Sequence, residues 1–282
     1  MSLTPKSDLS IAMLVFYCPA LVLSSFIIFK HGLKRQLGWF YLVLLSLLRV
    51  IGSSTSIYMA VNNDYSSGLV ETSIITSAVG TAPLISALLG FQNRVHDGME
   101  PHGVSPSAFR MIQLLVLPGI ILSIVGGTKL DDTDASDVHT GLDCLKASSI
   151  IFLVLYLVLA VICCYAIMRV RWVRDEEKPL MRACVLSLPF LLVRIVHTVC
   201  AGFSQPGDFF YFGNANVWAE AFMMFAMEAI CVSLYAFAGL KTPKMEEKQL
   251  LEGDYEESSY GRMGNGVEME SQQTGHARHE GA

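Results

Sequence analysis

The chain has 282 residues, of which 52% are hydrophobic and 16% are charged, whereas a typical soluble domain has about 25% charged residues. Its net charge of −5 comes without a basic stripe that would meet nucleic-acid phosphates. This composition argues against an ordinary soluble enzyme and against nucleic-acid binding, and it favours an integral membrane protein.

Seven segments are long enough to cross a bilayer, which takes about 20 mostly apolar residues. Helices are the expected form, because lipid offers no hydrogen-bond partners to the backbone. The predicted fold is therefore all-α and polytopic, with seven transmembrane helices. The predicted spans cover residues 9–29, 37–60, 67–91, 109–127, 147–168, 181–203 and 216–240.

The distribution of basic residues predicts the orientation, because cytoplasmic loops are enriched in Lys and Arg. The loops after the first, third and fifth spans, together with the C-terminal segment, hold 15 Lys and Arg, while the other side holds three. The N-terminus is therefore expected outside the cell or in a lumen, and the C-terminus in the cytosol. Residues 1–8 form a short outer segment in this prediction, 9–244 the transmembrane domain, and 245–282 an acidic, disordered tail.

Ionisable residues within the spans are the candidates for a site, because each costs about 2.5–3.5 kcal/mol at mid-membrane. These ionisable residues could form a structural ion-pair network that holds the helices together, or they could line a polar cavity that binds a ligand or moves a proton. The candidates are Arg49, Glu71, Arg194, His197, Glu220 and Glu228.

Glu228 is the central residue of this set. A helical rise of about 1.5 Å per residue puts Arg49 and Arg194 at similar depths, with Glu228 the nearest carboxylate to both. Arginine stays ionised and needs an acidic or carbonyl partner at its own depth. We therefore predict that Glu228 faces the bundle interior and bonds at least one arginine. The competing interpretation makes Glu228 a neutral acid catalyst; no other catalytic residue is identified.

Other features of the spans and loops carry weaker signals. Pro19, Pro83, Pro118 and Pro189 interrupt four spans and predict kinks. Glu71 and Glu220 follow similar arginine motifs in the second and sixth spans, which suggests a parallel internal repeat. Cys144 and Cys200 both lie near the predicted outer face, where oxidising conditions would permit a disulfide between them. No metal site and no cofactor are expected.

Short motifs in several spans carry a family resemblance. Pro189–Arg194, the loop from Phe203 to Phe212, Glu220–Glu228, and the pair Arg49 and Gly52 resemble a fungal seven-transmembrane family of unassigned function. More distantly, they are similar to fungal RTA-like lipid-translocating exporters. Where the RTA-like pattern has a glutamate shortly after the arginine of the sixth span, this chain has His197. The resemblance implies a fungal origin.

Three functions are compatible with these observations. The first is a transport- or resistance-like protein that handles a lipid or an apolar small molecule. The second is a membrane-embedded, terpene-cyclase-like enzyme of fungal secondary metabolism, with Glu228 as its acid. The third is a seven-helix receptor outside the rhodopsin class. The expected partners are the lipid bilayer and the lipid or small molecule, with no nucleic acid; protein partners and the choice between plasma membrane and endomembrane stay open.

Overall fold

In the computed structural model, the described residues (5–31, 37–99, 103–130, 135–205, 207–211 and 216–242) form helices and no strands. Seven of these helical segments are long and apolar enough to cross a membrane, which confirms the predicted all-α fold. The predicted tail, residues 245–282, lies outside the described residues. The helices are α1 (Pro5–His31), α2 (Leu37–Asn62), α3 (Ser67–Val79), α4 (Thr81–Asp97), α5 (Pro106–Lys129), α6 (Ala135–Met168), η1 (Val170–Trp172), α7 (Lys178–Phe203), α8 (Val217–Ala219), η2 (Glu220–Ala226) and α9 (Met227–Lys241).

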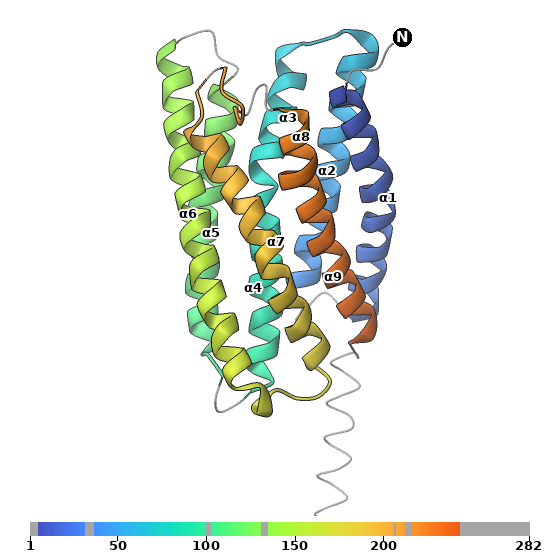
Figure 1. Cartoon of the computed structure of the whole chain (residues 1–282), viewed down its shortest axis with the longest axis vertical. Coiled ribbons are helices and arrows are strands. Elements are labelled where there is room, and N and C mark those ends of the chain that lie inside the picture. The colour runs from blue at the N-terminus through green and yellow to red at the C-terminus, as the bar shows by residue number, and fades with distance from the viewer. Residues whose placement is uncertain are drawn as a thin grey trace, which may run out of the picture. The chain divides into compact units, whose positions relative to one another are not determined.

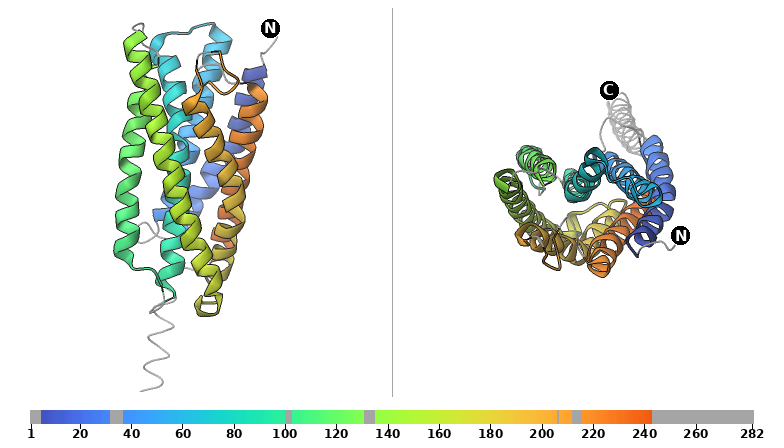
Figure 2. Two further views of the ribbon diagram at one scale, coloured as in Figure 1. Left: turned by 60° about the vertical axis from the view of Figure 1, so that its left-hand side comes forward. Right: turned by 90° about the horizontal axis from the view of Figure 1, so that it is seen from above.

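The spans run side by side as a bundle (Figure 1), and we call the end at which α1 begins the upper end. Seen from above (Figure 2), they follow one another around the bundle, and α9 returns to pack against α1. The α4 helix also contacts α7 across the bundle. Most of the third span is buried, whereas each of the other spans buries less than half of its apolar window. The third span is therefore the centre of the fold.

The third span consists of two helices that meet at Gly80. Proline lacks an N–H group, and its ring crowds the carbonyl group four residues earlier. Pro83 thus disrupts the helical ladder at Val79, where α3 ends. The other three prolines, Pro19, Pro118 and Pro189, lie inside continuous helices. Of the four predicted kink sites, only Pro83 coincides with a break between helices.

Helices extend beyond several of the predicted apolar segments. The α6 helix begins at Ala135, twelve residues before the predicted span over 147–168. Its first turns are polar, and Asp137 in them accepts a hydrogen bond of 2.5 Å from Lys129 at the end of α5. Hydropathy identifies only the apolar part of a helix. Polar turns extend α6 beyond that part, because polar side chains in them, such as Asp137, bond to neighbouring residues.

A buried ion pair lies at the lower end of the bundle. Arg94 on α4 donates from Nε and Nη2 to the Glu177 carboxylate at distances of 3.0–3.2 Å, and both side chains are buried. Glu177 immediately precedes α7. Sequence analysis counted Arg94 only as a charge of the loop after the third span; in the structure it lies inside α4, which continues to Asp97. This pair ties α4 to the connection between α6 and α7.

The seven cysteines are all free thiols. The disulfide considered between Cys144 and Cys200 is therefore not formed in this structure.

Candidate functional site

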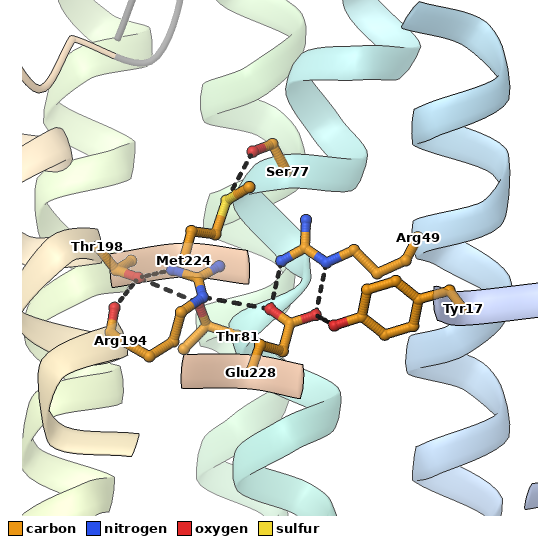
Figure 3. Close-up of polar contacts among 8 residues, drawn as sticks. All are labelled: Tyr17, Arg49, Ser77, Thr81, Arg194, Thr198, Met224 and Glu228. Atoms are coloured by element: carbon orange, nitrogen blue, oxygen red, sulfur yellow. Dashed lines mark hydrogen bonds and ion pairs between the residues drawn. The ribbon is translucent and has the colours of Figure 1, made fainter. Parts of the chain in front are cut away.

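The Glu228 carboxylate is the centre of a hydrogen-bond network that joins four spans (Figure 3). Its Oε1 accepts hydrogen bonds from Tyr17 Oη on α1 (2.7 Å) and from Arg49 Nε on α2 (2.6 Å). Its Oε2 accepts from Arg49 Nη2 (2.5 Å) and from Arg194 Nε on α7 (3.3 Å). Glu228 thus bonds both arginines, where its depth in the sequence predicted a bond to at least one of them.

A second layer of hydroxyl groups extends the network to α4. Arg194 Nη1 donates to Thr198 Oγ1 at 2.6 Å, one turn along the same helix. The hydroxyl groups of Thr198 and Thr81 are 3.1 Å apart. Thr81 is the first residue of α4, directly after the break at Gly80. The polar groups of five helices therefore meet at one level of the bundle.

Two glycines make room for Arg49 and for the helix that carries it. A Cβ atom at Gly80 would lie 2.7 Å from Arg49 Nη2, the atom that donates to Glu228. A Cβ atom at Gly52, one turn after Arg49, would lie 2.5 Å from the Thr76 hydroxyl oxygen on α3. The absence of a side chain at Gly80 therefore leaves space for the Arg49 guanidinium, and the absence of one at Gly52 allows α2 to pack closely against α3.

Replacing Gly80 by Ala is therefore expected to displace Arg49 from Glu228 and to destabilise the fold by about 1–3 kcal/mol, as for other overpacked sites. Gly68→Ala is the matched control, because a Cβ atom there has no neighbour within 4 Å, while both substitutions remove a glycine from a helical region. The measurement is the midpoint of thermal unfolding in mild detergent. Equal midpoints for the two variants would contradict this assignment.

A cavity of about 320 Å³ lies between Arg49 and the upper end, bounded by α1, α2, α3 and η2. Arg49 and Glu220 line it, and Lys6 and Tyr65 lie at its upper part. Its remaining polar lining consists of hydroxyl groups, from Ser7, Ser10, Ser53, Ser56, Ser73, Thr76 and Ser77. A hydroxyl-lined cavity with a guanidinium at its inner end can bind the polar group of a small molecule.

Part of the guanidinium of Arg49 remains available to this cavity. Nε and Nη2 bond to Glu228, whereas Nη1 points away from Glu228 (Figure 3) and makes no hydrogen bond to the described residues. The hydroxyl group of Ser53, one turn along α2, likewise makes no hydrogen bond within the described part of the chain. Both side chains line the cavity.

The π-helix η2 (Glu220–Ala226) begins at Glu220 and ends two residues before Glu228. Such wide turns are rare and are frequently found at functional sites. A π turn changes the rotation per residue, so it sets the direction in which Glu220 points relative to Glu228. Glu220 lines the cavity, where it interacts electrostatically with Lys6 and Arg49, whereas Glu228 does not line it.

Three of the predicted site residues lie outside the hydrogen-bond network: Glu220, which lines the cavity, and Glu71 and His197, which do not line it. Glu71 is partly exposed on α3 and does not line the cavity, so it is not the counterpart of Glu220 that the proposed repeat required. His197 is buried, and neither of its ring nitrogens has a hydrogen-bond partner among the described residues. Its ring packs edge-to-face against Phe210, with 5.9 Å between ring centroids.

Sequence analysis missed three members of the network: Tyr17, Thr81 and Thr198. Their side chains are neutral, and similar residues occur throughout the spans. Tyr235, for example, is equally buried but bonds to Ser187. Nothing in the sequence marks which of these hydroxyl groups approaches a charge, so only the packing of the helices identifies them.

The fold and the buried network define a multi-pass, seven-helix membrane protein with a charged centre. The chain belongs to the family of the domain of unknown function DUF7702, whose profile matches residues 3–245 and so covers all seven spans. No curated protein matches the chain. The match is in keeping with the seven-span family of unassigned function that sequence analysis suggested, whereas the fungal origin and the likeness to RTA-like exporters stay predictions.

Proposed function

We propose that this protein handles a lipid or an apolar small molecule, in the manner of a transport or resistance protein, by binding the polar group of that molecule in the hydroxyl-lined cavity. The supporting observation is the cavity itself, which Arg49 and Ser53 line, while Arg49 Nη1 and the Ser53 hydroxyl form no hydrogen bond to any described residue. Its volume of about 320 Å³ is within the range of ligand pockets, roughly 300–1,000 Å³.

The lining of the cavity suits a molecule with both polar and apolar parts. On α1, α2 and α3, both apolar side chains and hydroxyl groups line the cavity. Methionine is flexible and adapts to irregular ligands, and three methionines contribute to the lining. The apolar lining includes Leu9, Met13, Leu48, Met59, Val70, Ile74 and Met224.

The enzyme alternative receives less support from the geometry. Both oxygens of Glu228 are occupied by donors, and Glu228 does not line the cavity. A general acid must be within hydrogen-bond reach of the atom that it protonates. Glu228 has no such access to a molecule in this cavity.

Binding to the cavity is testable with the full-length protein in phosphatidylcholine nanodiscs. The probes are long-chain amphiphiles that differ only in the head group: alcohol, amine, carboxylate and phosphate. At least one probe is expected to bind with one-to-one stoichiometry by native mass spectrometry and to raise the unfolding temperature. Ser56→Phe, which fills the cavity, should abolish binding, whereas Val22→Phe on the exposed face of α1 should not. Failure of every probe, or binding that survives Ser56→Phe, would overturn the proposal.

We further propose that the upper end faces the cell exterior or a lumen, so that the cavity lies in the outer half of the membrane domain. The basis is the 15 to three division of Lys and Arg between the two sides. A tag at residue 1 should be accessible to protease in intact cells or vesicles, and a tag at the C-terminus should be protected. The reverse pattern would contradict this orientation.

A further inference from the structure

We infer that the polar group of the ligand is an anion, a carboxylate or a phosphate, held by Arg49 Nη1 and the Ser53 hydroxyl at the inner end of the cavity. This inference rests on the proposed function and adds the chemical class of the ligand. It follows from the charges of the buried network, from the geometry of the guanidinium, and from the distribution of the other charges around the cavity.

The buried network has an excess positive charge. It holds two guanidinium groups and one carboxylate, and the exposed fractions of Arg49, Arg194 and Glu228 are 5%, 2% and 0%. Guanidinium stays protonated in proteins, so Glu228 balances one of the two charges. A buried charge without a partner is costly. A second anion next to Arg49 would neutralise the remaining positive charge of the network.

The remaining charges at the cavity do not supply that anion. Glu220 interacts electrostatically with Arg49 but forms no hydrogen bond with it among the described residues. Glu220 also interacts with Lys6, a residue of opposite charge that lines the same upper part of the cavity. These two charges offset each other, so the excess stays with the deep network.

Two hydrogen-bond donors, Arg49 Nη1 and the Ser53 hydroxyl, are available to an acceptor in the cavity. Glu228 occupies the edge of the guanidinium formed by Nε and Nη2. Nη1, which carries two N–H groups, lies on the side away from Glu228 (Figure 3). Ser53, four residues after Arg49, lies on the same helix face and lines the same cavity. Together they offer charge-assisted hydrogen bonds, which are stronger than neutral ones and suit carboxylate and phosphate oxygens.

The test compares head groups on the full-length protein in phosphatidylcholine nanodiscs. The long-chain carboxylate and the long-chain phosphate are expected to bind at least about tenfold more tightly than the matched alcohol and amine, the effect of one charge-assisted hydrogen bond. Inorganic phosphate and acetate form a separate arm. If they bind as tightly as the long-chain anions, the site binds anions, but the assignment of a lipid as its ligand is rejected.

Ser53→Asp is the decisive variant, because it places a carboxylate beside Arg49 Nη1. It should reduce binding of the long-chain anions at least about tenfold and raise the unfolding temperature of the ligand-free protein. Ser53→Asn, of similar size but neutral, is the matched control: it should weaken anion binding less than Ser53→Asp does and should not raise the unfolding temperature. Ser53→Ala should weaken binding of the anions more than binding of the alcohol, because only the anions form charge-assisted hydrogen bonds with Ser53.

Two outcomes would overturn the inference. One is an alcohol that binds as tightly as the anions, which leaves the proposed function intact. The other is a Ser53→Asp protein that is less stable than Ser53→Asn, since an excess positive charge at Arg49 would then be absent. Failure of every probe would instead reject the proposed function itself.

Discussion

Replacing Glu228 by Gln is expected to cause the largest loss of folded protein among single substitutions of the charged residues. The change leaves Arg49 and Arg194 buried without a negative charge between them. Removing one partner from a buried ion pair typically costs about 3–5 kcal/mol. The measurement is the fraction of monodisperse protein after extraction in mild detergent, together with its unfolding temperature.

A second substitution in the same chain should partly restore the fold. Arg49→Gln is expected to rescue Glu228→Gln more effectively than Arg194→Gln, because Arg49 forms the shorter, bidentate contact, at 2.5 and 2.6 Å against 3.3 Å. Rescue of this kind is the signature of two coupled residues. Glu71→Gln is the control, since this glutamate lies outside the network.

The alternative in which Glu228 acts as an acid leads to a different result. Glu228→Gln would then fold normally and lose activity, and no arginine substitution would restore it. A normal yield of the Glu228→Gln protein would therefore reject the structural role assigned here.

Glu177→Gln is expected to have the second-largest effect, again about 3–5 kcal/mol, because it leaves Arg94 buried at the lower end without its carboxylate. The unfolding temperature should fall, and the connection between α6 and α7 should become more sensitive to limited proteolysis. The reason for the second effect is that Glu177 anchors this connection to α4.

The same connection provides a matched control. Lys178 donates a hydrogen bond to Asp175, which holds the pKa of Asp175 below its ordinary value. Asp175 is exposed, and exposed ion pairs contribute little to stability. Asp175→Asn should therefore leave the unfolding temperature unchanged. Equal effects of Asp175→Asn and Glu177→Gln would contradict the role assigned to the buried pair.

The sequence by itself determined the class of the protein and the depth of its charges. Seven continuous apolar segments of about 20 residues predict seven helices, because a helix satisfies its backbone hydrogen bonds within one segment when lipid offers no partners. The position of a residue within a span also determines its depth, since the helical rise is fixed. Depth alone was enough to predict that Glu228 bonds at least one of Arg49 and Arg194.

The direction in which each residue points was decided by the tertiary structure. Glu71 and Glu220 occupy similar sequence contexts, yet of these two only Glu220, the first residue of the π-helix η2, lines the cavity. Depth is a property of one helix, whereas direction depends on the rotation and packing of all of them. For the same reason, nothing in the sequence predicted the hydrogen bond from Tyr17 to Glu228.

The tertiary structure also decided where helices end and which charges are buried. Arg94 and Glu177 are 83 residues apart and belong to segments that read as polar loops. A charge in a loop and a charge in a buried pair look alike in the sequence, because burial depends on what the rest of the chain places around them. The continuation of α4 to Asp97 brings Arg94 into the bundle and makes the pair.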